Sequence, residues 1–264
     1  MKKHRPIGLF DSGVGGLTVL EQVHQLMPQE DLVYIADSGN APYGDKSVDF
    51  IRQRAVELCN VLIEQDVKAI VIACNTATAA AAEHCREIFD LPIIAMEPGV
   101  KPALENSKNG LVGVLATKET AHSAQLDALI STFAGDRQVL VQACPGLVEQ
   151  IEADQINDEK TKRLLREYLA PMQSLGVDTI VLGCSHYPIV RQQIHDIVGA
   201  DVTLIETGTP VAKELLRRLR NDDLCSDAKG QGELRIFSSA VHAKTGKIIK
   251  GLTSLPYKLI VLAS

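Results

Sequence analysis

Short apolar runs rich in Val, Ile and Leu recur along this chain, and longer amphipathic stretches separate them. In residues 48–66 and 160–175, the apolar side chains fall on one face of a helix. Strands that are almost continuously apolar are typical of parallel sheets covered by helices on both faces. The chain is therefore predicted to be α/β. The expected strands are 6–10, 32–36, 69–73, 92–96, 111–115, 139–143, 179–183, 202–205, 233–237 and 257–263.

The two halves of the chain resemble each other. AIVIACNTAT (69–78) matches TIVLGCSHYP (179–188), and IGLFDSG (7–13) corresponds to VGVLATK (112–118). Similar strands alone could produce such matches, but a Cys at the same strand end in both halves favours a true repeat. We therefore expect two pseudo-symmetric domains, each a parallel sheet flanked by helices, with the active site in the cleft between them. The expected boundaries are 1–97 plus 210–264 for the first domain, to which the tail returns, and 98–209 for the second.

Composition excludes several functional classes. The chain has 264 residues, 45% of them hydrophobic, and 27 Lys+Arg against 33 Asp+Glu, so it lacks the basic stripe of a nucleic-acid binder. No apolar run approaches the ~18 residues of a membrane span, and the N-terminal run is too short for a signal peptide. The six cysteines form no CxxC pair. We therefore expect a cytoplasmic protein with reduced thiols, no disulfide framework, no zinc site, and neither nucleic acid nor membrane as partner.

The residues that suggest chemistry follow the predicted strands. Parallel sheets bind ligands beyond the carboxyl ends of their strands, where helices begin. Helix starts offer free N–H groups that suit a carboxylate, and they lower the pKa of a thiol. The candidates at these strand ends are Asp11, Ser12, Cys74, Asn75, Thr76, Thr117, Cys184, Ser185 and His186.

A free cysteine is often only a small buried hydrophobe. Two strand-end cysteines, each followed by an amide or hydroxyl residue, favour a functional role for Cys74 and Cys184. By contrast, Cys59, Cys85 and Cys225 lie within helix or loop patterns and are interpreted as structural. Cys144 ends a strand, but a proline follows it, and we favour a structural role.

Three other residues allow two interpretations each. His186 could be a core residue or a metal ligand, but it is better placed as a proton partner for Cys184, two residues away. Asp11 could cap the helix that starts near Gly15 or take part in catalysis. Tyr43, in the turn APYG, could belong to a plain loop or close over a ligand. The glycines of DSGVGG permit close backbone approach, but they form neither GxGxxG nor a Walker A motif.

Two thiols in matching halves suit one reaction class in particular. Racemisation removes a proton from one face of a carbon and returns a proton to the other. Two acid–base groups on opposite sides accomplish this without turning the substrate over. Two similar domains that face each other across a cleft supply such an arrangement.

At these residues the sequence resembles the glutamate racemases of bacterial cell-wall synthesis, within the aspartate/glutamate racemase superfamily. The matching blocks are IGLFDSGVGGLTVL, APYG, IVIACNTATA, GVLATKET, ACPGLVEQIE and LGCSHYP. The resemblance implies two α/β domains, no pyridoxal phosphate or other cofactor, no metal, and D-glutamate production for peptidoglycan. It also implies that Cys74 takes the α-proton from D-glutamate and that Cys184 takes it from L-glutamate.

The resemblance assigns further roles by position. Asp11 matches the partner on the Cys74 side, and His186 and Glu152 match partners on the Cys184 side. Positions that contact substrate in the family correspond to Asp11, Ser12, Tyr43, Gly44, Asn75, Thr76, Thr117, Ser185 and His186.

One departure affects the expected substrate. Ser185 stands where the family usually has Thr, which keeps the hydroxyl but removes a methyl group. A racemase of aspartate or another acidic amino acid therefore stays open. So do a non-catalytic amino-acid-binding regulator and a cysteine hydrolase, although the hydrolase would leave the second thiol unexplained. Glutamate is the expected small-molecule partner, and a homodimer is a further expectation.

Overall fold

The computed structural model describes residues 2–240 and 245–262, and within them all ten expected strands form. Their ends lie within two residues of the expected ones. All the strand pairs are parallel. The strands are β1 (Ile7–Asp11), β2 (Leu32–Ala36), β3 (Ala69–Ile72), β4 (Ile93–Ala95), β5 (Leu111–Ala116), β6 (Gln138–Ala143), β7 (Thr179–Leu182), β8 (Thr203–Ile205), β9 (Leu234–Ser238) and β10 (Tyr257–Val261).

The strands form two sheets with related topology. The first has the order β10-β9-β2-β1-β3-β4, and the second has the order β6-β5-β7-β8. The succession β2-β1-β3-β4 is thus repeated as β6-β5-β7-β8, so that Cys74 and Cys184 follow equivalent strands. The predicted fold class, α/β with two pseudo-symmetric parallel sheets, is confirmed. The C-terminal strands β9 and β10 extend the first sheet, because β9 pairs with β2.

Helices cover both faces of each sheet, because strands that are apolar on both faces must be buried on both. Local signals set several helix ends: the Ser47 side chain caps α2 by accepting from the Phe50 N–H, and Gly176, at φ +73°, ends α8. The helices are α1 (Leu17–Leu26), α2 (Val48–Glu64), α3 (Asn75–Ile88), α4 (Val100–Asn106), α5 (Lys118–Ala121), α6 (Ala124–Phe133), α7 (Leu147–Glu152), α8 (Glu159–Leu175), α9 (Arg191–Val198), α10 (Gly208–Asn221) and α11 (Thr245–Leu252).

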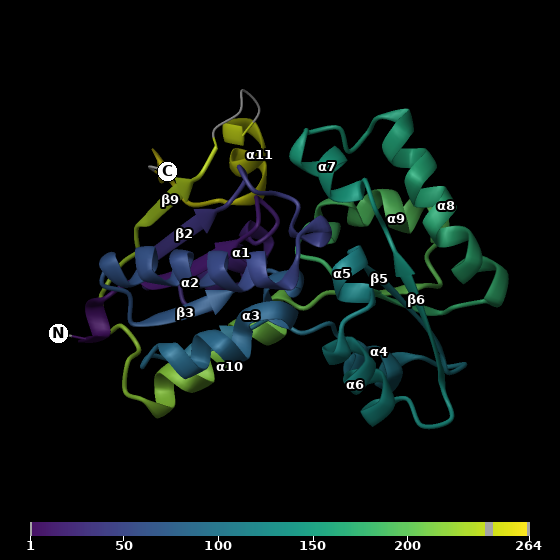
Figure 1. Ribbon diagram of the computed structural model, residues 1–264, viewed down its shortest axis with the longest axis horizontal. Coiled ribbons are helices and arrows are strands. Elements are labelled where there is room, and N and C mark those ends of the chain that lie inside the picture. Colours follow the sequence, from purple (N-terminus) through teal and green to yellow (C-terminus); the bar gives the residue numbers. More distant parts are fainter. Residues whose placement is uncertain (1, 241–244, 263–264) are drawn as a thin grey trace.

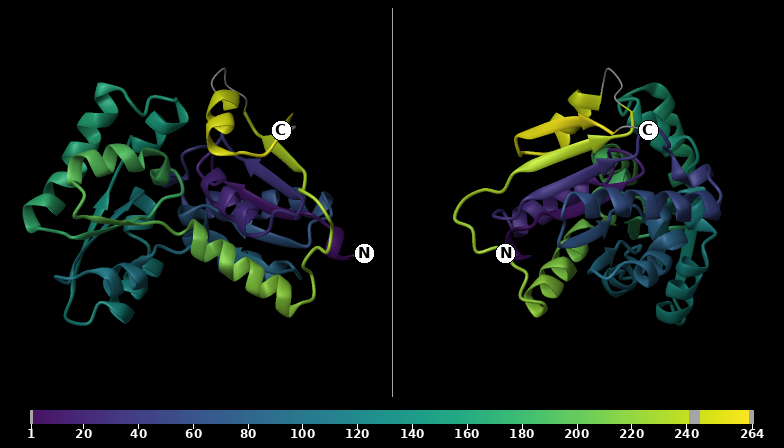
Figure 2. Two further views of the ribbon diagram at one scale, coloured as in Figure 1. Left: turned by 180° about the vertical axis from the view of Figure 1, so that it is seen from behind. Right: turned by 60° about the vertical axis from the view of Figure 1, so that its left-hand side comes forward.

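Each sheet separates two hydrophobic cores. In the first sheet, α1, α10 and α11 cover one face, and α2 and α3 cover the other. In the second sheet, α7, α8 and α9 cover one face, and α4 and α6 cover the other. We call the first sheet with its helices the first lobe and the second sheet with its helices the second lobe; Figures 1 and 2 show them side by side.

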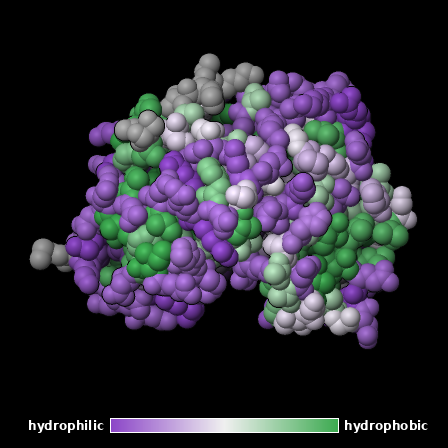
Figure 3. Space-filling model, viewed as in Figure 1, coloured by the Kyte–Doolittle hydropathy of each residue, from purple (hydrophilic) through white to green (hydrophobic). Residues whose placement is uncertain are grey.

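The chain crosses between the lobes twice. It leaves the first lobe at residues 96–99, between β4 and α4, and returns at residues 206–207, between β8 and α10. A space-filling view shows a notch between the lobes on its lower side (Figure 3). Within the described ranges, no helix is both long and apolar enough to span a membrane.

Candidate active site

The carboxyl ends of β1, β3, β5 and β7 carry the polar residues singled out in the sequence. Hydrogen bonds join these strand ends across the two lobes: Ser185 Oγ donates to Asp11 Oδ2 at 2.8 Å, and Thr18 Oγ1 donates to the Ser185 carbonyl at 3.1 Å. The site is therefore built from both halves of the chain.

Cys74 follows β3 and caps α3. Its Sγ accepts from the Ala77 N–H at 3.4 Å and lies 3.8 Å from Ser12 Oγ. Burial and the nearby Asp11 charge raise the pKa of Cys74 to about 12, although the Ala77 N–H opposes this shift. A negative charge on Cys184 raises the pKa of Cys74 further. A pKa of about 12 would keep Cys74 a protonated thiol at neutral pH.

Cys184 occupies the equivalent place after β7 and has a different partner. Its Sγ lies 3.8 Å from Nδ1 of His186, whose Nε2 lies 2.6 Å from Glu152 Oε1. Burial of the imidazole by itself would lower the pKa of His186. The Cys184 thiol and the Glu152 and Asp11 carboxylates outweigh burial, and the pKa lies well above its usual 6.5. The imidazole of His186 therefore lies between the Cys184 thiol and the Glu152 carboxylate.

Asp11 lies at the end of β1 and is fully buried. One carboxylate oxygen accepts from the Gly13 N–H at 2.8 Å, and the other accepts from Ser185 Oγ. The alternative that Asp11 caps the following helix is wrong. The helix α1 begins at Leu17 with Gly16 as its N-cap, and no side chain caps it. Burial raises the pKa of Asp11, and the His186 charge opposes this shift.

The glycines after Asp11 let the backbone lie directly against the catalytic candidates. A Cβ on Gly13 would lie 1.9 Å from Glu152 Oε1, and a Cβ on Gly15 would lie 2.3 Å from His186 Nδ1. The Val14 N–H between them donates to Glu152 Oε1 at 2.7 Å. The sequence motif predicted this close approach, but it did not indicate that the partners come from the second lobe.

Three threonine hydroxyls form a buried cluster where the lobes meet. Thr76 Oγ1 lies 2.9 Å from Thr117 Oγ1 and 3.2 Å from Thr120 Oγ1, and Thr117 Oγ1 donates to Thr120 Oγ1 at 3.0 Å. Thr76 and Thr117 were predicted as site residues, whereas Thr120 was missed. Its position one turn after Thr117, in the block GVLATKET, was the available signal.

Asn75 begins α3 and is buried. Its Nδ2 donates to the Met96 carbonyl at 3.3 Å, but Oδ1 finds no donor among the described residues. A buried acceptor without a donor costs free energy, and the ammonium group of an amino acid could supply that donor.

Tyr43 and Gly44 belong to a short 3₁₀ turn, η2 (Tyr43–Asp45), in the first lobe. The Tyr43 ring is buried, and its hydroxyl donates to Asp37 Oδ2 at 2.6 Å. Gly44 meets the second lobe, since a Cβ there would lie 3.0 Å from the Thr117 Cβ. The hydroxyl of Tyr43 thus points toward Asp37, within the first lobe. The part of the turn that faces the second lobe is its backbone at Gly44.

Of the other four cysteines, three are buried and Cys225 is partly exposed. Cys59 and Cys85 are buried within α2 and α3. Cys144 is buried after β6, its Sγ lies 3.5 Å from the Gln142 carbonyl, and burial raises its pKa to about 12. None of these three cysteines hydrogen-bonds to the residues described above within residues 2–240 and 245–262.

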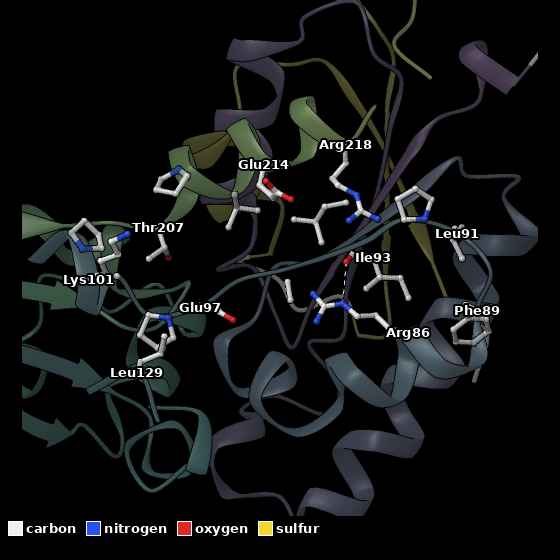
Figure 4. Close-up of a pocket in the computed structure, with 18 of the residues that line it drawn as sticks. Arg86, Phe89, Leu91, Ile93, Glu97, Lys101, Leu129, Thr207, Glu214 and Arg218 are labelled. Atoms are coloured by element: carbon white, nitrogen blue, oxygen red, sulfur yellow. Dashed lines mark hydrogen bonds between the residues drawn. The ribbon is translucent and has the colours of Figure 1, made fainter. Parts of the chain in front are cut away.

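A cavity of about 920 Å³ opens between the lobes, away from the thiols (Figure 4). It runs along the edge of β4, where Arg86 Nε donates to the Ile93 carbonyl at 3.4 Å. Both crossovers line it, through Glu97 and Thr207. Its described lining includes no cysteine and none of the predicted site residues. In the described part of the chain, no group of three or more His, Cys, Asp or Glu side chains could hold a metal ion.

Comparisons with known proteins agree with the fold. The family model for Asp/Glu/Hydantoin racemase matches residues 16–215. The glutamate racemase of Herpetosiphon aurantiacus is 46% identical over 246 residues, which make up 93% of this chain and 97% of that relative.

Solved structures extend this similarity to nearly the whole chain. The glutamate racemase of Francisella tularensis in complex with D-glutamate is 31% identical, with a TM-score of 0.85, and 99% of this chain and 98% of that one are covered. The Escherichia coli glutamate racemase in complex with L-glutamate and activator UDP-MurNAc-ala is 30% identical, with a TM-score of 0.86 and 98% coverage of both chains. The chain therefore belongs to the Asp/Glu/Hydantoin racemase family, as a member of its glutamate racemase group of isomerases.

Proposed function

We propose that this glutamate racemase moves the substrate α-proton between two faces with Cys184 and Cys74 as its two acid–base groups. The observation that carries the proposal is that Cys74 and Cys184 follow equivalent strands but have different neighbouring side chains. Cys74 keeps its proton because it is buried near Asp11, whereas Cys184 adjoins the imidazole of His186. One thiol is set up as an acid and the other as a base.

In the direction from L-glutamate, the Cys184 thiolate removes the α-proton and becomes a thiol. Cys74 donates its own proton to the opposite face of the same carbon and becomes a thiolate. The product is D-glutamate, and the net charge of the site is unchanged. His186 stabilises the starting thiolate, and Glu152 holds the imidazole through the 2.6 Å contact.

In the direction from D-glutamate, the same steps run in reverse. Cys74 must then begin as the thiolate, and the Ala77 N–H and Ser12 Oγ are placed to stabilise it. The carboxylate and ammonium groups of the substrate remain to be held. For these we propose Asn75, Thr76, Thr117, Ser185 and the Tyr43–Gly44 turn, together with Ser12, Asp11 and His186.

The two thiols supply both proton transfers, so the proposed reaction requires no pyridoxal phosphate and no metal. We expect activity to survive dialysis against a chelator and treatment with hydroxylamine. Circular dichroism of L- or D-glutamate measures that activity. Complete loss that an added cofactor restores would contradict the mechanism.

The biological setting is proposed from the family. We propose that the D-glutamate supplies peptidoglycan synthesis in the cytoplasm, which accords with six free cysteines. We also propose that the chain divides into domains at 1–97 plus 210–264 and 98–209. A homodimer stays a prediction that light scattering on the purified protein checks.

The deciding experiment is proton NMR of each enantiomer in heavy water with Cys74→Ala and Cys184→Ala. Each variant should lose racemisation in both directions, because one face lacks its acid–base group. Cys184→Ala should still exchange the α-proton of D-glutamate slowly, and Cys74→Ala that of L-glutamate. Cys59→Ala is the control, since this buried thiol lies within α2 and should leave racemisation unchanged.

Two results would overturn parts of the proposal. Near-normal racemisation by either Cys74→Ala or Cys184→Ala would eliminate the two-base mechanism. Exchange confined to the opposite enantiomers would keep the mechanism but reverse the assignment of the thiols.

A further inference from the structure

Asp37, which the sequence did not place in the site, lies close behind it. It follows β2, and its backbone N–H donates to the Asp11 carbonyl at 2.9 Å, so that it adjoins the end of β1. Its side chain is fully buried and accepts the Tyr43 hydroxyl at 2.6 Å. Whatever holds Asp37 therefore also holds the Tyr43–Asp45 turn.

Arg54, on α2, holds Asp37 with two parallel hydrogen bonds. Its Nε donates to Asp37 Oδ2 at 2.9 Å, and its Nη2 donates to Oδ1 at 2.8 Å. Asn40 Nδ2 donates to both oxygens at 3.1 Å. Paired guanidinium–carboxylate bonds of this kind fix direction as well as distance. The arrangement leaves Asp37 with one defined orientation toward Tyr43.

The Tyr43–Asp45 turn forms one wall of a narrow space between the lobes. Pro42, Gly44 and Asp45 line one side, and Thr117 lines the other. A Cβ added to Gly44 would lie 3.0 Å from the Cβ of Thr117, so the turn lies close to the threonine cluster. The position of the Tyr43–Asp45 turn therefore sets how this wall faces the second lobe.

We propose that Arg54 is a positioning residue for substrate binding. Acting through Asp37 and the Tyr43 hydroxyl, it holds the Tyr43–Asp45 turn where the turn can bind the carboxylate end of glutamate. This inference rests on the proposed function, in which the Tyr43–Gly44 turn contacts the substrate. The hydrogen bonds of Arg54 within the described residues reach Asp37 and Glu57, and neither Cys74, Cys184 nor His186 is among its partners. Loss of Arg54 should thus weaken binding and leave proton transfer nearly intact.

The test is steady-state kinetics of the full-length Arg54→Ala variant with both enantiomers. KM should rise about tenfold or more in both directions, while kcat changes by less than about threefold, because binding is lost equally from the ground and transition states. Added guanidinium, far below unfolding concentrations, should occupy the vacated site and lower KM toward the wild-type value.

Arg52→Ala is the matched control. Arg52 lies on the same helix, and its Nε donates to the Ala80 carbonyl at 2.8 Å, away from the turn. It should leave KM unchanged and show no response to guanidinium. Tyr43→Phe removes only the hydroxyl and should raise KM in the same direction. It decides the question alone if Arg54→Ala fails to fold.

The proposal is overturned if Arg54→Ala or Tyr43→Phe keeps the wild-type KM, or if kcat falls while KM stays constant. It is also overturned if Arg52→Ala raises KM equally, or if guanidinium fails to restore binding to Arg54→Ala. Failure of the two-base mechanism would appear instead in the heavy-water exchange of the cysteine variants. Each proposal can thus fail without the other.

Discussion

Glu152 Oε1 lies 2.6 Å from Nε2 of His186 and 2.7 Å from the backbone nitrogen of Val14. One carboxylate oxygen therefore joins the imidazole beside Cys184 to the loop that follows β1 in the other lobe. Asp11 links the lobes in the opposite direction, because this residue of the first lobe accepts a hydrogen bond from Ser185 of the second lobe. The contact between the lobes and the protonation of His186 thus involve the same side chain.

We expect Glu152→Gln to change the pH dependence of the reaction from L-glutamate. The amide oxygen can still accept from Val14, but the charge that helps to raise the pKa of His186 is gone. The pKa of His186 should fall, so the imidazolium that supports the Cys184 thiolate is lost at a lower pH. The measurement is kcat/KM for L-glutamate against pH, and its alkaline limb should move to lower pH.

Glu149→Gln is the control for this change, because Glu149 is an exposed residue of the same helix, α7. It should keep the wild-type profile. Identical profiles for Glu152→Gln and the wild type would show that Glu152 does not tune His186.

We expect Gly15→Ala to reduce racemisation at least ~100-fold in both directions, because small misplacements of catalytic groups have large effects. The new Cβ would lie 2.3 Å from His186 Nδ1 and would push the ring away from Cys184. Circular dichroism of either enantiomer measures the loss. Gly251→Ala should be fully active, since no atom of the described residues outside its own helix and chain neighbours lies within 4 Å of its added Cβ. Equal activity of the two variants would contradict the close packing of Gly15 on His186.

Much of this fold was predictable because its strands are buried on both faces. β3 and β7 are buried strands without polar alternation, and a Cys that begins a polar block stands two residues after the end of each. Parallel strands bring their carboxyl ends to one edge, and this position after a strand in each half made Cys74 and Cys184 candidates for the site. The glycines after β1 similarly predicted a close approach of the backbone.

Other parts of the site depend on contacts that no local pattern contains. Arg54 lies on an amphipathic helix, where an arginine at a partly exposed position resembles any solvated one. Its pairing with Asp37 spans 17 residues and exists only because α2 packs against the sheet. The direction of the Tyr43 hydroxyl depends on that same pairing. To predict Thr120 as a site residue, one would have needed to know that α5 of the second lobe lies against Thr76 of the first.

We expect Thr76→Val to lower kcat/KM about tenfold or more without unfolding the protein, since a hydrogen bond to a charged group is worth ~1.5–3 kcal/mol. Valine keeps the shape of threonine but removes the hydroxyl that faces Thr117 and Thr120. Asn75→Ala should act similarly, because Asn75 Oδ1 is a buried acceptor without a donor among the described residues. Steady-state kinetics with both enantiomers checks both variants.

Thr132→Val is the control for the threonine cluster. Thr132 is exposed on α6, and its hydroxyl donates within the helix to the Ala128 carbonyl. It should have wild-type kinetics. Wild-type kinetics in both Thr76→Val and Asn75→Ala would instead show that the substrate carboxylate and ammonium bind elsewhere.

Arg54→Gln should destabilise the protein more at neutral pH than in acid. Burial alone would raise the pKa of Asp37. Hydrogen bonds from Arg54 and Tyr43 outweigh burial and hold the pKa below its usual 3.8. As the pH falls, the unfolded chain therefore takes up this proton first. The contribution of the pair to stability is complete above about pH 3.8 and is lost as the pH falls through the pKa in the folded protein.

The expected loss at pH 7 is about 3 kcal/mol, because removing one partner leaves a buried carboxylate unpaired. Urea unfolding of the wild type and Arg54→Gln at pH 7 and pH 3 measures the difference in the free energy of unfolding, which should shrink at the lower pH. Glu57→Gln removes only the exposed partner of Arg54 and should change stability little at either pH. The wild type and Arg54→Gln could instead differ in their free energy of unfolding by the same amount at both pH values. That result would mean that Arg54 stabilises the fold by packing, because only its pairing with the Asp37 carboxylate depends on the protonation of Asp37.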